Sequence, residues 1–254
     1  MLSKRDFLIL RPPRKGERMA KPVKLGWGVR REGRSGIWTR NAVKGISVRG
    51  ERRKRDSRIE WRAWDPNRSK VAAALLRTNN DPTSLLPEPG STCLYLGASY
   101  GGTVSFVHDM VCGSGNHLEG QVIAVEIAPR AMRELAALAS QRPGLVPVLG
   151  DARLPHTVSP YIRGKADWIH QDLSMADQAA AFVKMAGAFL KPGGTGLLSL
   201  KAASERSFDG DDDTRFAKAE RILGESELEV VERIELAHHH QEQHVVFHVR
   251  KPAD

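Results

Sequence analysis

The sequence predicts an α/β fold: a mainly parallel seven-stranded sheet with an antiparallel hairpin at one edge. From residue 91 onward, short apolar runs typical of buried strands alternate with segments of helical periodicity. This alternation indicates βαβ units, whose parallel strands are buried on both faces. The last two apolar runs are too close together for a crossover helix, so they must form an antiparallel pair.

Each element follows from its own run of residues. The expected strands are 92–98, 121–127, 145–152, 166–173, 194–202, 228–236 and 244–251. Between them, apolar residues at helical spacing predict helices over 103–112, 129–141, 177–190 and 213–226. A further helix is expected over 65–79, with Asp65 as its N-cap and Pro66 at its first position.

The N-terminal part divides by composition. Residues 1–35 lack periodicity and are rich in Arg, Lys, Gly and Pro, which predicts a disordered basic tail. Residues 36–64 contain short alternating runs with glycine turns, which predict a small basic β appendage. Residues 65–254 then form the main domain, with Trp61 and Trp64 expected in the core at its junction with the appendage.

Charge is distributed unevenly along the chain. Residues 1–70 contain 22 lysines and arginines against seven acidic residues, whereas the remainder contains 17 against 23. A basic segment joined to an acidic body favours a polyanionic partner such as nucleic acid.

The compartment is expected from the cysteines and from the absence of targeting signals. The two cysteines, Cys93 and Cys112, lie in apolar patterns and are expected to be buried free thiols in a reducing compartment. No segment resembles a signal peptide or a membrane span, so we expect a cytoplasmic protein.

The predicted sheet carries a glycine-rich turn and acidic residues at four strand ends. The turn "GASYGG" at 97–102 follows the first strand, and Glu126, Asp151 and Asp172 end the next three. Ligands of open α/β sheets bind at this edge. Ser99 replaces the middle glycine of the dinucleotide fingerprint, which disfavours NAD. A nucleoside without phosphates, such as S-adenosylmethionine, fits better.

Several motifs, in order, resemble the fibrillarin family, in particular its archaeal form. They are "WRAWDPNRSKVAAALL", "LYLGASYGGTVSFVHD", "VIAVEIAPRAMREL", "VPVLGDAR", "DWIHQDLSMADQA" and "HVVFHVRK", and the likeness covers roughly residues 37–251. The resemblance implies a class I, Rossmann-like methyltransferase that uses S-adenosylmethionine to methylate ribose 2′-hydroxyls of rRNA and of tRNA. It also implies three partners: a box C/D guide RNA, a Nop-type scaffold and a kink-turn-binding ribosomal-type protein.

The resemblance also implies the site residues. Cofactor contacts are expected from Gly97, Ala98, Gly102, Thr103, Glu126, Ile127, Asp151, Ala152, Asp172, Leu173, Ser174, Met175 and Gln178. Met175 stands where the family has a glutamine. No metal is expected.

By position in the family, the implied catalytic residues are Lys70, Asp172, Lys201 and His244. Lys201 is the expected base, and Lys70 is the cation that favours its neutral form. Asp172 would orient the lysines, and His244 would position the ribose or relay a proton.

The sequence also suggests a zinc site and two other functions as alternatives. The triplet His238–His240 suggests zinc, but its spacing matches no common zinc site. A stand-alone O-methyltransferase would share the cofactor site but would need an apolar substrate lid, and none is evident. A non-catalytic RNA-binding assembly subunit would not need both lysines, Asp172 and His244.

Overall fold

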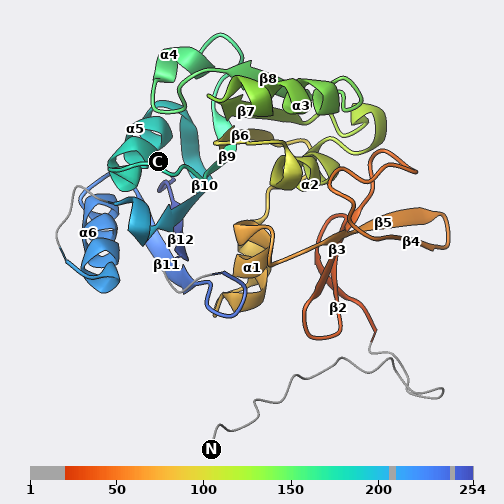
Figure 1. The fold of residues 1–254 in the computed structure, drawn as a ribbon, viewed down its shortest axis with the longest axis horizontal. Helices are drawn as coiled ribbons and strands as arrows, with labels where there is room; N and C mark the ends of the chain where they lie inside the picture. Colours follow the sequence, from red (N-terminus) through yellow and green to blue (C-terminus); the bar gives the residue numbers. More distant parts are fainter. Residues whose placement is uncertain (1–20, 206–209, 241–243, 254) are drawn as a thin grey trace, which may run out of the picture.

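The computed structural model describes residues 21–205, 210–240 and 244–253, and these form two sheets with helices around the larger one (Figure 1). The larger sheet has seven strands in the order β11-β12-β10-β9-β6-β7-β8. Its strands are β6 (Thr92–Leu96), β7 (Gln121–Glu126), β8 (Leu145–Leu149), β9 (Ala166–Gln171), β10 (Leu190–Lys201), β11 (Glu229–Glu235) and β12 (His244–Arg250). Strands β6 to β10 pair in parallel, and β12 is antiparallel to both β10 and β11. The predicted fold class is therefore confirmed, including the antiparallel hairpin at one edge.

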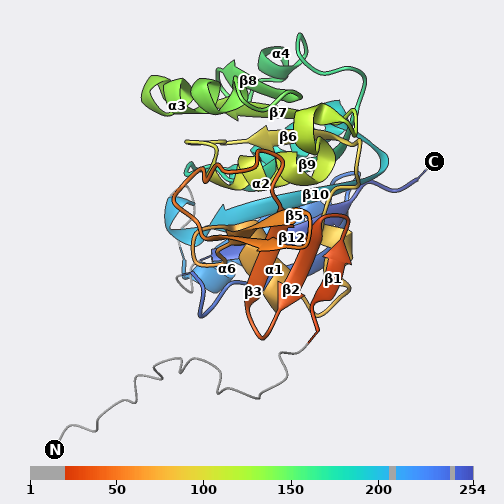
Figure 2. The same cartoon turned by 90° about the vertical axis from the view of Figure 1, so that its right-hand side faces the viewer.

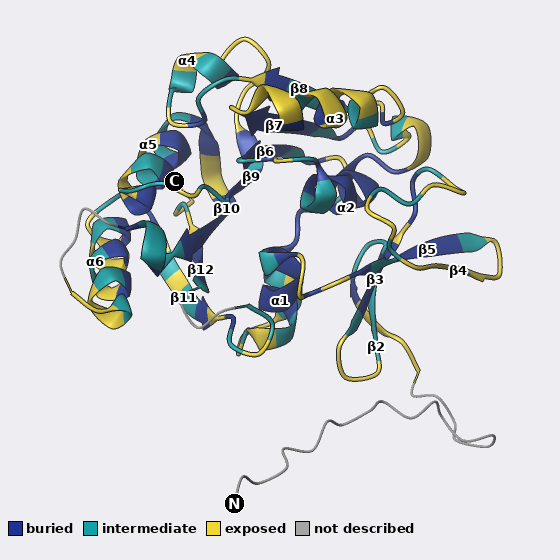
Figure 3. Cartoon of the chain, viewed as in Figure 1, coloured by how far each residue is buried: buried dark blue, intermediate teal, exposed yellow. Residues whose placement is uncertain are grey.

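Helices cover both faces of this sheet, because alternate strand residues point to opposite sides. In β6, Cys93 and Tyr95 belong to one core cluster, and Leu94 and Leu96 belong to the other. Helices α1 (Lys70–Arg77), α2 (Gly102–Val111) and α3 (Pro129–Ala139) contribute buried residues to the first cluster. Helices α4 (Pro155–Val158), α5 (Gln178–Phe189) and α6 (Asp212–Gly224) contribute to the second. The strands β6, β7, β9 and β12 between these layers are almost entirely buried (Figure 3).

The smaller sheet is antiparallel, with the order β1-β2-β3-β5-β4. Its strands are β1 (Val23–Gly26), β2 (Val29–Glu32), β3 (Gly36–Arg40), β4 (Arg53–Asp56) and β5 (Ile59–Trp64). Figures 1 and 2 both show it beside α1 and α2. Leu25, Val29, Ile37 and Trp64 join the core of the larger domain, so this sheet packs against the body.

The prediction of disorder over residues 1–35 is wrong for residues 23–32, which form β1 and β2. A tight turn at Gly28, with φ of 67°, pairs the two strands, and β2 extends the sheet at β3. Burial of one apolar residue from each strand, Leu25 and Val29, stabilises them although their other residues are mostly polar. Residues 1–20 of the expected tail lie outside the described residues.

The start of the first helix also differs from the prediction. α1 begins at Lys70, and its N-cap is Ser69, whose hydroxyl accepts from the backbone N–H of Ala72. The carboxylate of Asp65 instead accepts from the backbone N–H and side chain of Asn67. Asp65 therefore caps a turn before the helix, and Lys70 becomes the first helical residue.

Two further expectations about the interior are confirmed. Cys93 and Cys112 are free and buried. Trp61 and Trp64 are both core residues, and Trp64 stacks on Phe106 with ring centroids 5.2 Å apart. Over the described residues, no helix is long and apolar enough to cross a bilayer.

The part of the chain that the structure describes also contains three 3-10 turns: η1 (Pro82–Leu85), η2 (Ser114–Asn116) and η3 (Ala202–Ser204).

Candidate active site

The four predicted catalytic residues come from α1 and from three adjacent strand ends. Asp172 follows β9, Lys201 ends β10 and His244 begins β12. β10 lies between the other two strands, and Lys201 and His244 are partners in the β10–β12 register. Because β12 is antiparallel, its first residue meets the last residue of β10 at the same edge.

Lys70 reaches this edge from the first turn of α1. Its Nζ donates to Oδ1 of Asp172 across 2.5 Å, and both side chains are partly buried. A cation at a helix N-terminus is unfavourable beside the positive end of the helix dipole. The Asp172 carboxylate offsets this cost and fixes the direction of the lysine side chain.

The glycine-rich turn lies against the same strand end. The backbone N–H of Asp172 donates to the carbonyl of Leu96 across 2.9 Å, which joins β9 to the start of the turn. Gly97 has φ of 88°, and a Cβ there would lie 2.3 Å from the carbonyl oxygen of Asp172. Glycine is therefore required where these two chain segments meet.

Thr103 connects this turn to Lys70, the first of the two predicted catalytic lysines. Its hydroxyl is 3.1 Å from the hydroxyl of Ser69, the N-cap of α1. Ser69 immediately precedes Lys70, so the glycine-rich turn and Lys70 are held in one arrangement.

Glu126 clamps the glycine-rich turn from β7. Its carboxylate accepts from the backbone N–H of Ser99 across 2.7 Å and from that of Ala128 across 2.8 Å. A carboxylate accepts about four hydrogen bonds, so the two hydroxyls of a ribose could still be bound here.

Two exposed apolar residues flank the neighbouring strand ends. Ile127 after β7 is 63% exposed, and Leu149 at the end of β8 is 57% exposed. Large apolar side chains at a ligand-binding edge are suited to the faces of a planar base. Ile127 was predicted from the sequence; Leu149 was not.

Asp151, two residues beyond β8, is held by Arg153. The guanidinium of Arg153 donates to both carboxylate oxygens at 2.6 to 3.0 Å. These hydrogen bonds lower the pKa of Asp151, so it stays ionised and able to accept from an amino group. Ala152 beside it is buried.

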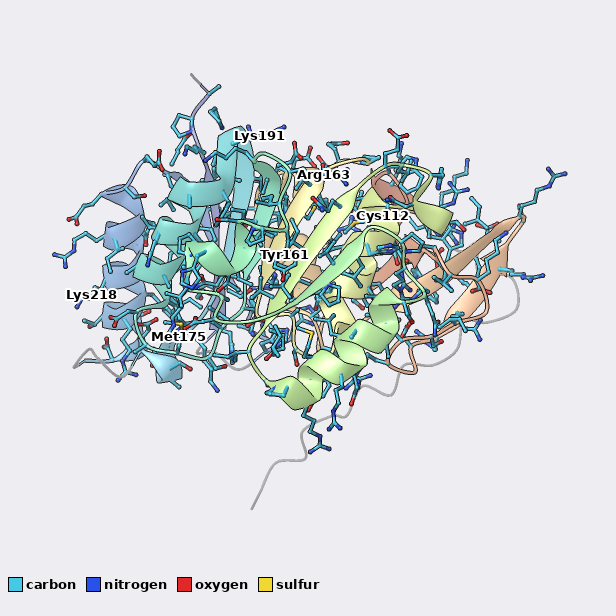
Figure 4. All side chains as sticks on the ribbon, turned by 90° about the horizontal axis from the view of Figure 1, so that it is seen from above. Cys112, Tyr161, Arg163, Met175, Lys191 and Lys218 are labelled. Carbon is cyan, nitrogen blue, oxygen red and sulfur yellow. The ribbon has the colours of Figure 1, made fainter. Side chains whose placement is uncertain are left out.

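The remaining predicted cofactor residues follow β9. Leu173 and Met175 are partly buried and Ser174 is exposed. Met175 lies on the α5 side of the molecule (Figure 4) and lines a cavity of about 430 Å³ with Arg153 and Asp177.

The prediction for Gln178 differs from the structure. Its side chain is fully buried and bonds to the Glu205 carboxylate across 2.8 Å and to the Lys201 carbonyl across 3.2 Å. Gln178 is therefore placed to support Lys201 and not to contact a ligand. Glu205 also accepts from the backbone N–H groups of Asp177 and Gln178, which caps the start of α5.

A cavity of about 810 Å³ opens between the smaller sheet and the glycine-rich turn. Five predicted site residues line it: Gly97, Ala98, Gly102, Thr103 and Asp172. Of the four predicted catalytic residues, Asp172 alone lines this cavity.

Residue His240 lies beside the predicted catalytic residue His244, a position that no sequence motif indicated. Its ring centroid is 5.9 Å from that of His244. Partial burial and the nearby Lys70 ammonium lower the pKa of His240. Its Nε2 is buried without a hydrogen-bond partner among the described residues. Its neighbours His238 and His239 line the larger cavity.

Comparison with known proteins identifies the family. The fibrillarin family model matches residues 26–252. The fibrillarin-like rRNA/tRNA 2′-O-methyltransferase of Thermococcus sibiricus is 39% identical over 223 residues, which cover 87% of this chain and 92% of the relative.

Two solved structures agree with this match. Aeropyrum pernix fibrillarin in complex with natively bound S-adenosyl-L-methionine superposes with a TM-score of 0.73 at 31% identity, over 91% of this chain and 100% of that one. The fibrillarin of a fibrillarin/Nop5p complex superposes with a TM-score of 0.72 at 28% identity, over 86% and 98%. The chain belongs to the fibrillarin family.

Proposed function

We propose that this protein transfers a methyl group from S-adenosylmethionine to ribose 2′-hydroxyls of rRNA and tRNA, working in a box C/D guide-RNA particle. The observation that carries the proposal is the meeting of Lys70, Asp172, Lys201 and His244 at one sheet edge, beside the glycine-rich turn. Similarity to proteins named rRNA/tRNA 2′-O-methyltransferase supports the reaction and the substrate class.

The residues present fit the cofactor. Glu126 would hold the ribose hydroxyls, Ile127 and Leu149 would enclose the adenine, and Asp151 would accept from its amino group. The methionyl part would lie against Gly97 and Thr103. When bound, S-adenosylmethionine supplies an electrophilic methyl group on a positively charged sulfur.

In the proposed mechanism Lys201 accepts the proton of the 2′-hydroxyl, because a neutral hydroxyl is a poor nucleophile. Asp172 holds Lys70 through their ion pair and offsets positive charge in the site. His244, opposite Lys201 in the sheet, positions the acceptor ribose or relays the proton. Gln178 and Glu205 keep the Lys201 backbone in place.

The partners are proposed by similarity. A solved fibrillarin/Nop5p complex supports a Nop-type scaffold. A box C/D guide RNA and a kink-turn-binding protein complete the proposed particle, in which base pairing selects the target. The archaeal source of the relatives supports a role in the archaeal cytoplasm.

Reconstitution tests the proposal. The full chain, assembled with a box C/D guide, a scaffold and a kink-turn-binding protein, should methylate the guided ribose when S-adenosylmethionine is supplied. Calorimetry should show cofactor binding that Glu126→Ala weakens and that a chelator does not change. Tighter binding of NAD, or a particle with bound cofactor that never methylates RNA, would contradict the proposal.

A further inference from the structure

The large cavity extends well beyond the residues expected to hold the cofactor. One wall is the glycine-rich turn with Asp172, and the opposite wall belongs to the smaller sheet and the segment before α1. Its volume of about 810 Å³ lies toward the upper end of the range of ~300–1,000 Å³ typical of ligand pockets. Figures 1 and 2 show the smaller sheet beside α1 and α2, the helix that follows the glycine-rich turn. The cavity is therefore a groove between two parts of the fold that leads to Asp172.

Three arginines line the sheet side of this groove: Arg49, Arg52 and Arg68. The Arg49 guanidinium is 5.1 Å from the ring centroid of Tyr100 and forms an ion pair with Glu134 across 3.1 Å. Arg68 donates to the backbone carbonyl of Arg49 across 3.3 Å. Arg52 lies 5.7 Å from the ring centroid of Trp38, another lining residue. Each guanidinium is thus oriented by a neighbour.

Arg52 and Arg68 also retain donors for a ligand. Within the described part of the chain, neither forms an ion pair with a carboxylate. Many other basic residues of the smaller sheet do: Arg30, Lys54 and Arg62, for example, are paired with acids. Guanidinium groups bind phosphate oxygens strongly because their fixed fork of donors matches the anion.

The wall that carries these arginines is fixed to the body by buried charges. Arg62 of β5 bonds to Asp109 of α2 across 2.7 Å, and Arg142 bonds to the other oxygen of that carboxylate across 2.7 Å. Thr39 of β3 is 3.3 Å from Asp109. This network holds the smaller sheet against α2, so the backbone of the arginine-bearing wall is held opposite the glycine-rich turn.

We propose that this groove binds the ribose–phosphate backbone of the substrate RNA beside the target ribose, with Arg52 and Arg68 as phosphate ligands. The inference rests on the proposed function and adds the residues that hold the strand. RNA is favoured because the groove leads from two arginines, which have no carboxylate partner among the described residues, to Asp172. Phosphates at one end would then bring a ribose to the other. Such contacts position a strand without reading its sequence, as suits a target chosen by base pairing.

A matched pair of double variants tests this inference. Arg52→Gln with Arg68→Gln removes two positive charges from the groove. Arg55→Gln with Arg58→Gln removes two exposed charges from the β4–β5 hairpin, which extends away from the body (Figure 1) and does not line the groove. Both double variants lose two positive charges, so their net charges are equal. Calorimetry with S-adenosylmethionine checks that each retains an intact cofactor site.

The measurement is fluorescence anisotropy of a labelled mixed-sequence 12-nucleotide RNA, titrated with the full chain at several KCl concentrations. The logarithm of the affinity falls linearly with the logarithm of the salt concentration. Loss of two phosphate contacts should make this slope less steep by about 1.4, because each contact on a single strand contributes about 0.7. The hairpin variant should retain the wild-type slope.

Three outcomes would overturn the inference: an unchanged slope in the groove variant, an equal decrease in the hairpin variant, or no salt-dependent RNA binding by the wild type. A groove variant that binds RNA normally but loses the Nop-type scaffold would assign the groove to a protein and also overturn it. In each case the proposed function stands if the assembled wild-type particle methylates RNA, so the two failures are distinguishable.

Discussion

Lys70 and Asp172 are 102 residues apart in the sequence, yet Nζ and Oδ1 of these side chains are 2.5 Å apart. The pair connects the first residue of α1 to the end of β9, and the two side chains are only 17% and 29% exposed. It links the segment that follows the smaller sheet to the center of the larger one. The ion pair is thus both a structural connection and part of the proposed reaction site.

Breaking this pair should affect the reaction more than the fold. Asp172→Asn keeps the shape but removes the negative charge, and we expect single-turnover methyl transfer to fall by about 10²-fold or more. Because the pair is partly solvated, the free energy of unfolding should change by only about 1 kcal/mol. Single-turnover rates measured in the assembled particle check the expected loss of methyl transfer, and urea denaturation checks the change in the free energy of unfolding. Near wild-type transfer by Asp172→Asn would remove Asp172 from the mechanism.

Glu205 should act through the backbone of Lys201. Its buried carboxylate bonds to Gln178, which in turn bonds to the Lys201 carbonyl. Glu205→Ala should lower the methyl-transfer rate roughly tenfold, equivalent to about 1.4 kcal/mol in the barrier, with little change in cofactor affinity. Glu205→Gln retains an acceptor and should recover part of the rate. Equal rates in the Ala and Gln variants would argue against a positioning role.

Asp109 should be important for stability, because it is buried between two arginines. Asp109→Asn leaves Arg62 and Arg142 without their shared carboxylate, and we expect a loss of about 3–5 kcal/mol in the free energy of unfolding. The exposed Arg221–Glu225 pair is the control, with N–O separation of 3.9 Å. Glu225→Gln should cost less than about 0.5 kcal/mol. Similar losses in both variants would contradict the buried-network account.

Three buried histidines should make the fold sensitive to acid. Burial lowers the pKa of His108, His170 and His248 from 6.5 to about 4. Below pH 6.5 the unfolded chain therefore binds more protons than the folded one, so stability falls as the pH decreases from about 6.5 to about 4. Each histidine contributes up to about 1.4 kcal/mol per pH unit in this window.

Urea denaturation between pH 4.5 and 7.5 measures this dependence. His170→Gln removes one titrating group, and its stability should decrease less steeply with falling pH than that of the wild type, whatever its stability at pH 7.5. A His170→Gln protein with the wild-type slope would show that His170 does not titrate differently in the two states.

The sheet and its helices could be predicted from the sequence because the central strands are short apolar runs that alternate with segments of helical periodicity. The seven runs gave the parallel strands and the final hairpin directly, since chain length between strands limits their direction. Strands β1 and β2 could not be recognised this way. Each is four residues long and has no continuous apolar run; β1 pairs with β2, and β2 pairs with β3.

The site was predicted only in part. The approach of Lys70 to Asp172 depends on packing between distant segments, so it came from the family resemblance and not from any local pattern. The family resemblance assigned Gln178 to the cofactor, but the first turn of α5 directs it toward Glu205. His240 lies in a loop without periodicity, where no sequence signal separates it from the two preceding histidines.

The most direct test of the proposed mechanism is the single-turnover methylation rate of a particle assembled with Lys201→Ala. If Lys201 accepts the 2′-hydroxyl proton, the rate should fall by about 10²–10⁴-fold. Cofactor affinity, measured by calorimetry, should remain close to wild type, since the base contacts the acceptor and not the adenosine. In the wild-type particle the rate should rise with pH to a plateau as the base loses its proton. A Lys201→Ala particle that methylates the guided ribose at near wild-type rate would contradict this account.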